Sequence, residues 1–289
     1  MIRSMTAFAT AETELDGWLL AWELRSVNHR YLDASLRLPE AFRSLEPEAR
    51  VRVGAVIKRG RVDGTFVFKR LDHEIPAIRL NQALVGQLVA AARTVEAVSD
   101  RPLANFHAFE ILNWPGVLQE MEPDRERLGA GALDLLSEAL TRLVAGREAE
   151  GHQLGELLAE RCAKLRELTA GVRDRQPEVL KAIRQRIMVR LKEIAATPDP
   201  DRLEQELVYL AQKLDVAEEL DRLDAHVEDV LRALRDIEPT GRRLDFLLQE
   251  MHREANTLGA KSADIETTRA AVEMKVLIEQ MREQAQNIE

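Results

Sequence analysis

The sequence predicts an α+β fold, in which an N-terminal antiparallel β-sheet with helices is followed by long helices and a C-terminal helical domain. Three observations lead to this prediction. The first 38 residues read as strands, and the pair Asp16-Gly17 is a hairpin turn signal. From about residue 125 onwards, apolar residues recur at spacings of three and four. Aromatic residues make up only 4% of the chain, which favours helices built on Leu, Ala and Val over a β-sandwich.

In the N-terminal part, residues 18–27 and 34–38 are expected to be strands, and the second ends at Pro39. A helix is expected over residues 40–57, and Gly60 ends it. Residues 61–70 then predict another strand. Residues 81–99 predict a helix with Leu84, Leu88 and Val95 on one face, and residues 102–115 predict a short helix and loop.

The later part of the chain is expected to be helical throughout. Residues 128–168 predict one long helix with a break near Gly146 or Gly151, and Pro177 is expected to interrupt the pattern. A basic helix, KAIRQRIMVRLK, continues over residues 179–194, and residues 197–200 form the expected domain boundary. Three helices then follow over residues 202–235, 242–258 and 267–287. Their narrow apolar seams indicate packing against other helices and favour a homo-oligomer.

Charge is distributed unevenly along the 289 residues. The net charge is −9, yet residues 1–70 hold 12 Lys and Arg against 9 Asp and Glu, a net +3, so the remainder carries −12. A basic N-terminal part on an acidic body can meet a polyanion such as RNA locally. The alternative is that +3 over seventy residues is too weak to indicate any partner.

Several classes of protein are excluded by what the sequence lacks. Its single cysteine, Cys162, can form neither an internal disulfide nor a cysteine metal site. The first residues, MIRSMTAFAT, do not form a secretory signal, and no apolar run approaches the roughly 20 residues that span a bilayer. We therefore expect a cytoplasmic protein with no membrane contact. Phosphate-loop, GxGxxG, HExxH and GxSxG motifs are also missing.

Two C-terminal helices place acidic residues in rows. On the first helix, one stripe about 60° wide holds Asp215, Glu219, Arg222 and His226. The segment 242–262 has an apolar stripe flanked by two polar rows: Arg243, Glu250 and Glu254 on one side, and Asp245, Gln249, His252 and Asn256 on the other. If the two helices form a hairpin, the rows can face each other and hold Mn²⁺ or Mg²⁺ beside a phosphate. Spacing alone favours the alternative, which is solvated ion pairs along each helix.

A third group of polar residues lies in the N-terminal segment RSVNHRY. Alternation puts Arg25, His29 and Tyr31 on one face and Asn28 and Arg30 on the other, and this mixture suits phosphate contact and base stacking. His29 can also act as a general base toward a ribose 2′-hydroxyl, or be an ordinary hydrogen-bonded strand residue. The nearby turn adds Lys58, Arg59 and Arg61. The group Arg147, Glu148 and Glu150 is expected to be a solvated helix face.

Long segments of the chain resemble the YicC/YloC family of bacterial stress-associated proteins. These segments are MIRSMTAFA, WELRSVNHRYLD, RLPE, RSLEP, NWPGVLQ, LEQELVYLAQKLDVAEELDRLDAHV, PTGRRLDFLLQEMHREANTLGAKS and VEMKVLIEQMREQAQNIE. The resemblance implies a metal-dependent endoribonuclease that favours Mn²⁺ and cleaves single-stranded or hairpin RNA. It also implies a ring-like hexamer, an N-terminal α+β domain, a helical C-terminal domain, and a role in small-RNA decay together with another ribonuclease.

The family motifs carry over to particular positions of this chain. The matching residues are Arg25, Asn28, Glu219, His226, Arg243, Asp245, Glu250 and Glu254. His252 stands where the family often has Asn, and His29 stands where some relatives have Gln. Neither histidine is therefore expected to be strictly required for activity. Together with the boundary expected at residues 197–200, the resemblance implies an RNA-binding domain over residues 1–124, a helical connector over 125–200, and a domain with a candidate metal site over 201–289.

From these matches we assign expected roles. The expected catalytic residues are Glu250, Glu254, His226 and Arg243, and the expected metal ligands are Glu219, His226, Glu250 and Glu254. RNA binding is expected from Arg25, Asn28, His29, Arg30, Lys58, Arg59 and Arg61. The main hypothesis is a nuclease whose metal activates water or stabilises the leaving oxygen. Two alternatives stay open: a non-catalytic RNA-binding adaptor that assists another ribonuclease, and a structural hexamer whose polar rows are subunit contacts.

Overall fold

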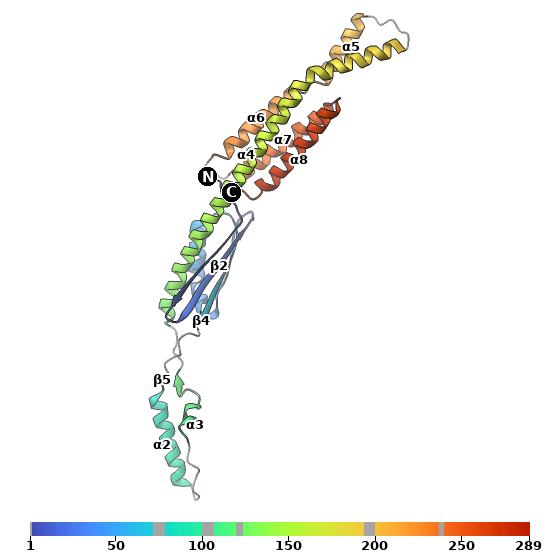
Figure 1. Cartoon of the computed structure of the whole chain (residues 1–289). Helices are drawn as coiled ribbons and strands as arrows, with labels where there is room; N and C mark the ends of the chain where they lie inside the picture. The colour runs from blue at the N-terminus through green and yellow to red at the C-terminus, as the bar shows by residue number, and fades with distance from the viewer. Residues whose placement is uncertain (1, 72–78, 100–106, 120–123, 194–199, 237–239) are drawn as a thin grey trace.

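The computed structural model describes residues 2–71, 79–99, 107–119, 124–193, 200–236 and 240–289 of the chain. The molecule is elongated, with a sheet near its middle, a helical bundle at one end and a small unit at the other (Figure 1). The α+β fold predicted from the sequence is therefore confirmed. Among the helices described, none combines the length and the apolar run needed to cross a bilayer.

The sheet has four strands in the order β1-β2-β4-β3. Their bounds are β1 Ala7–Leu15, β2 Trp18–Val27, β3 Leu32–Arg37 and β4 Gly60–Arg70. Asp16 and Gly17 both have positive φ, at 52° and 78°, which is the geometry of the tight turn that joins twisted antiparallel strands. The hairpin predicted at this dipeptide is confirmed.

One strand pair differs from the antiparallel sheet that the sequence predicted. β3 pairs with β4 in parallel, so the sheet is mixed. The reason is the connection between them, which contains the 3-10 helix η1 (Glu40–Leu45) and the helix α1 (Glu46–Val56). A crossover of this length returns the chain to the end of the sheet where it started, and parallel pairing follows.

The helices α1 and α4 cover the same face of the sheet and close the first hydrophobic core. Phe42 from η1 meets the ring of Phe66 edge-on, with 5.4 Å between the ring centroids. The indole of Trp22 is buried, and its Nε1 donates to the Ala132 carbonyl of α4 at 2.8 Å. This bond satisfies the one polar atom of the largest core side chain.

The helix α4 runs without interruption over Arg125–Glu193 and extends along most of the molecule (Figure 1). The expected break near Gly146 or Gly151 and the expected interruption at Pro177 are both wrong. α4 packs against the sheet through Leu128–Leu143 and against the bundle through Leu154–Val172. Tertiary contacts with the sheet and the bundle outweigh the local cost of Gly146 and Gly151, about 1 kcal/mol for each helical glycine. Pro177 is exposed and lies beyond Val172, the last α4 residue of the bundle core.

The second hydrophobic core lies in a four-helix bundle. α4 packs there against α6 (Ala217–Ala233), α7 (Gly241–Lys261) and α8 (Ile265–Ala285). The apolar stripe predicted on the segment 242–262 is buried as expected, with Leu244, Leu248 and Met251 fully enclosed. The stripe is thus the bundle-facing side of α7.

The single helix expected over residues 202–235 is two helices. α5 spans Pro200–Lys213 and lies along the distal end of α4, whereas α6 begins at Ala217. Between them, Val216 is buried in the bundle and the Asp215 carboxylate accepts from the Ala217 N–H at 2.9 Å. This local hydrogen bond stops α5 and starts α6 in a new direction. Of the boundary expected at residues 197–200, only Pro200, the first residue of α5, is described.

A small unit at the opposite end of the molecule contains α2 (Gln82–Val98), α3 (Ala108–Leu112), β5 (Arg79–Leu80) and β6 (Leu118–Gln119) (Figure 1). The Asn81 side chain accepts from the Leu84 N–H at 3.1 Å and caps α2. The helix predicted over residues 81–99 is confirmed. The short helix expected within residues 102–115 is α3, and residues 102–106 lie outside the described residues.

The two ends of the chain meet on α4 between the two cores. Ser4 forms a β-bridge with Ile288, and the Met5 N–H donates to the Asn287 carbonyl at 2.7 Å. The buried Arg147 donates from Nε to the Ser4 carbonyl at 2.5 Å and from a terminal nitrogen to the Glu289 carboxylate at 2.6 Å. The solvated face expected around Arg147 is therefore wrong. Burial lowers the pKa of Arg147, and the nearby Glu289 carboxylate opposes that shift.

Gly151 is expected to be needed for this junction. A Cβ there would lie 2.4 Å from the Ile2 carbonyl oxygen, whereas a Cβ at Gly171 of the same helix would meet nothing within 4 Å. Gly151→Ala should lower the free energy of unfolding by about 1–3 kcal/mol through overpacking. Gly171→Ala should raise it by about 0.5–1 kcal/mol through helix propensity. Urea unfolding measures both, and equal stabilisation by the two changes would contradict the close contact.

The start of α8 gives the fold a pH dependence. The Asp264 carboxylate accepts from Arg175 Nε at 2.6 Å and from the Thr267 N–H at 3.1 Å, and these bonds, led by the one from Arg175, lower the pKa of Asp264 to about 2. An unfolded aspartate titrates near about 3.9, so the carboxylate stabilises the fold above about pH 4 and this contribution is lost as the pH falls toward 2.

Asp264→Asn keeps a cap acceptor but removes the charge. Its urea midpoint should lie below that of the wild type at pH 7, and the two midpoints should converge as the pH falls from about 4 to 2. A difference that stays constant over that range would show that the carboxylate charge does not contribute.

Candidate functional site

The residues expected to bind RNA gather at one end of the sheet. β2 ends at Val27 and β4 begins at Gly60, and the two strands are antiparallel, so these ends are adjacent. Arg25 is exposed on β2 and lies in register with Asp63 of β4. Arg61 forms a two-pronged ion pair with Asp63, whose hydrogen bond raises the pKa of Arg61. The charge of Arg61 is therefore partly offset.

The alternation expected over residues 25–31 is wrong beyond Val27, because the strand ends there and residues 28–31 turn toward β3. In this turn His29 Nδ1 lies 2.9 Å from the Tyr31 carbonyl oxygen. The guanidinium of Arg30 lies over the exposed Tyr31 ring, 5.2 Å from its centroid. A cation beside an exposed aromatic face is a combination that suits single-stranded nucleic acid.

Arg59 and Asn28 make the two further contacts that hold this turn. Arg59 Nε donates to the His29 carbonyl at 3.4 Å, whereas Lys58 Nζ donates to the Gly54 carbonyl at the end of α1 at 2.9 Å. The Asn28 amide donates to the Gln286 carbonyl, just beyond α8, at 2.7 Å. Asn28 thus joins the end of the sheet to the end of the helical bundle. All seven residues expected to bind RNA therefore lie at the end of the sheet that faces the junction between the two cores, or within a few residues of that end.

The second half of the expected site is the hairpin of α6 and α7, and the structure confirms that these helices pack side by side. Lys261 Nζ lies 2.7 Å from Glu219 Oε1, and Arg222 lies 3.4 Å from Glu254 Oε1. The carboxylates of Glu219 and Glu254 are 7% and 8% exposed. Each is thus paired with a cation across the hairpin instead of being open to solvent.

The remaining candidates make other contacts. Glu250 is 3.8 Å from Arg253 on the same helix, and Arg243 is paired with Asp236 at 2.9 Å. His226 Nδ1 and Glu219 Oε2 are buried and have no hydrogen-bond partner within the described part of the chain. They stand seven positions apart on α6, about 10 Å along the helix axis. Asp215 lies before α6 begins, so it is not part of the stripe predicted with Glu219.

These observations test whether the chain as folded can hold the expected metal. Among the described residues, no three or more His, Cys, Asp or Glu side chains lie close enough together to hold a metal ion. A catalytic Mn²⁺ or Mg²⁺ needs several oxygen ligands around one point. The expected ligands Glu219, His226, Glu250 and Glu254 therefore do not fit one ion in a single chain, and we assign no chemical step to a metal.

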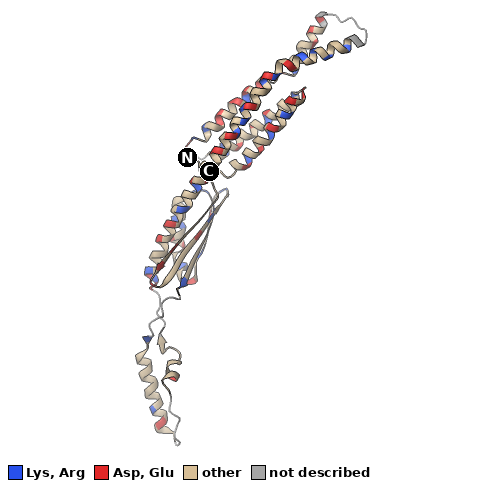
Figure 2. Ribbon diagram, in the orientation of Figure 1, with Lys and Arg blue, Asp and Glu red and all other residues tan. Residues whose placement is uncertain are grey.

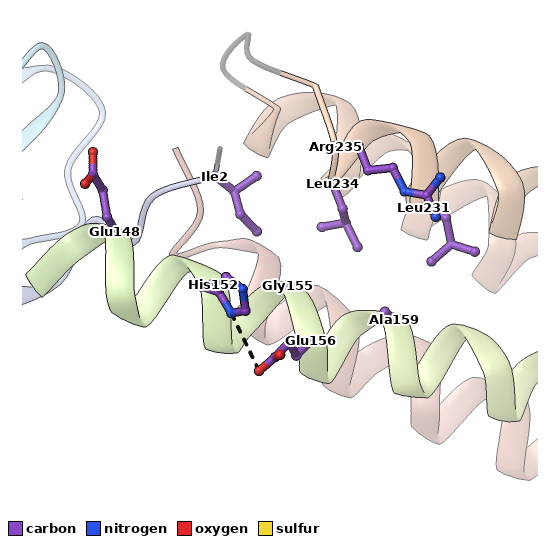
Figure 3. Close-up of a pocket in the computed structure, with 9 residues that line it drawn as sticks. All are labelled: Ile2, Glu148, His152, Gly155, Glu156, Ala159, Leu231, Leu234 and Arg235. Atoms are coloured by element: carbon purple, nitrogen blue, oxygen red, sulfur yellow. Dashed lines mark ion pairs between the residues drawn. The ribbon is translucent and has the colours of Figure 1, made fainter. Parts of the chain in front are cut away.

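A groove of about 430 Å³ lies at the same junction, between α4, the N-terminal segment and the end of α6 (Figure 3). Ile2, Leu231 and Leu234 form its apolar walls, and His152 stands at its edge with Nδ1 3.6 Å from the Glu156 carboxylate. His152 was not among the candidate residues identified from the sequence. The four-residue spacing from His152 to Glu156 was an available signal, but the groove itself is formed by segments that are distant in the sequence.

Comparisons with known proteins point to one family along nearly the whole chain. Residues 2–156 match the N-terminal region of the endoribonuclease YicC-like family model, and residues 172–289 match its C-terminal model. A relative from Haemophilus influenzae, named probable endoribonuclease YicC, is 39% identical over 289 residues and both chains are covered completely. A relative of the same name from Clostridioides difficile is 32% identical over 294 residues, again with complete coverage of both chains. The chain therefore belongs to the YicC-like endoribonuclease family.

Proposed function

We propose that this chain is an endoribonuclease. The observation that carries the proposal is the match over the full chain to relatives named probable endoribonucleases, at up to 39% identity. The geometry supports it, because the residues expected to contact RNA lie together at the junction of the two cores. A strand bound there would reach both the end of the sheet and the first turn of α7, because α7 begins at Gly241, which lies against the Ile288 carbonyl.

In this proposal the end of the sheet holds the RNA. Arg25, Arg30 and Arg59 would contact phosphates, which gives salt-sensitive binding. The Tyr31 ring is 62% exposed and would stack on a base. Asn28 would act indirectly, because its amide already donates to the Gln286 carbonyl and holds the turn against the bundle.

The proposed catalytic residues are those that the family motifs indicate, Glu250, Glu254, His226 and Arg243. Of these, Glu250 is the carboxylate most open to solvent, since its side chain is 32% exposed against 8% for Glu254. Dependence on Mn²⁺ or Mg²⁺ is part of the proposal, although the single chain does not gather the ligands for it. Assembly as a hexamer, cleavage of single-stranded or hairpin RNA, and cooperation with another ribonuclease in RNA decay also stay predictions.

One observation favours a second candidate function. The buried carboxylates of the α6–α7 hairpin are paired with Lys261 and Arg222, and such pairs can serve the packing of the two helices alone. A chain with an RNA-binding turn and structural carboxylates would be an adaptor that binds RNA and assists another ribonuclease.

A cleavage assay with matched variants separates these functions. Under the nuclease proposal, Glu250→Gln and Glu254→Gln should each lower the cleavage rate at least about 100-fold, while the affinity for RNA stays at the wild-type level. Glu218→Gln is the control, because Glu218 is the other carboxylate bound to Arg222 and is 70% exposed. EDTA should stop cleavage by the wild type, and Mn²⁺ should restore it. Binding without cleavage in any metal would support the adaptor.

The Tyr31 ring can be tested by itself. Tyr31→Ala should weaken binding of single-stranded RNA by about 5- to 150-fold, since stacking on one base contributes about 1–3 kcal/mol. Phe109→Ala is the control, because it removes an exposed ring from α3 in the small unit. Fluorescence anisotropy with a labelled oligonucleotide measures both variants. Equal affinities for Tyr31→Ala and the wild type would remove the turn from the RNA interface.

A further inference from the structure

The distal end of α4 is a strongly basic surface that the proposed site does not use. No acidic residue occurs between 179 and 192, a stretch with five Lys and Arg. Lys181, Arg184, Arg186 and Arg190 are all exposed. This segment lies beyond Val172, the last α4 residue of the bundle core, and among the described helices only α5 runs beside it (Figure 1). Figure 2 shows basic residues along this end of the helix.

Most of this charge is not neutralised within the described part of the chain. Arg184 is paired with Glu204 of α5 at 2.5 Å. Neither Lys181, Arg186 nor Arg190 forms an ion pair with any residue whose side chain is described. Arg186 and Arg190 are four positions apart and therefore lie on one face, an arrangement of like charges that destabilises a helix. Folding alone gives no reason for this arrangement, whereas a polyanionic partner would.

An apolar groove lies beside Lys181 and Arg184, whereas Arg186 and Arg190 lie on another face of α4. Its volume is about 330 Å³, and it runs between α4 and α5 with Leu180, Leu207 and Val208 in its walls and Lys181 and Arg184 at its edge. Single-stranded nucleic acid presents apolar base faces next to charged phosphates. Lys181 and Arg184 beside an apolar groove are complementary to that chemistry, and a duplex with its bases stacked inside would leave the groove empty.

We propose that the distal end of α4 is a second contact for the phosphate backbone of single-stranded RNA, separate from the turn that contains Tyr31. This inference rests on the proposed function, because it assumes that RNA is the polyanion. Arg186 lies about 60 Å along α4 from Arg147, which marks the junction of the two cores. A single strand with its bases stacked, at about 3.4 Å per nucleotide, would span this distance with roughly 17 nucleotides. The distal end would thus select long single strands over short ones.

The salt dependence of binding tests this contact. The probe is a 30-nucleotide oligouridine, and the protein is the full chain. Each phosphate contact to a single strand contributes about 0.7 to the slope of log affinity against log salt, so R186Q/R190Q should lower the slope by about 1.4. R232Q/R269Q is the matched control. It removes the same charge from α6 and α8, where each arginine is exposed and has an acidic partner three positions earlier. Its slope should equal that of the wild type.

Each other outcome overturns a specific statement. If the wild type binds oligouridine and R186Q/R190Q has an unchanged slope, the distal contact is wrong while the proposed function stands. If the wild type binds no RNA, the proposed function fails and the distal contact fails with it. If the slope is unchanged but R186Q/R190Q alters the molecular mass of the protein without RNA, the distal end contacts a second copy of the chain. Circular dichroism confirms that both double variants remain helical.

Discussion

The arrangement of the molecule depends on one buried cation, Arg147. A buried guanidinium needs hydrogen-bond acceptors and an opposite charge, and here Arg147 donates to the Ser4 carbonyl and to the Glu289 carboxylate. These partners belong to opposite ends of the chain, so satisfying one charge brings both termini onto α4. Gly151, one turn further on, lets the N-terminal backbone approach the helix closely enough for this to happen.

The junction held by Arg147 also positions the proposed RNA contacts. Gln286 and Asn287 are fixed beside Met5, and Asn28 binds the carbonyl of Gln286. The turn that presents Arg30 and Tyr31 is therefore held by the same contacts that close the chain. Because α4 is one rigid helix with a core on each side, the sheet and the bundle cannot separate at this point without loss of these bonds.

The α6–α7 hairpin shows why acidic rows in a sequence do not by themselves define a metal site. The positions of Glu219 on α6 and of Glu254 on α7 suit either a metal ion or a cationic side chain from the neighbouring helix. The pairing with Lys261 and Arg222 depends on how the two helices align, and a buried carboxylate takes whichever positive partner the alignment supplies. The family membership supports catalysis independently of where these carboxylates point.

Local patterns in the sequence determined the α+β class, the Asp16-Gly17 hairpin and the buried stripe of α7, because turn preference and apolar periodicity act over a few residues. They also identified the residues around Asn28 and Lys58 that gather at one end of the sheet. Only the tertiary structure decided that α4 continues through Pro177, that β3 pairs in parallel, and that Arg147 is buried. The parallel pairing and the burial of Arg147 depend on contacts between segments far apart in the chain. The free energy of such contacts exceeds local preference, and the spacing of residues along the sequence does not reveal them.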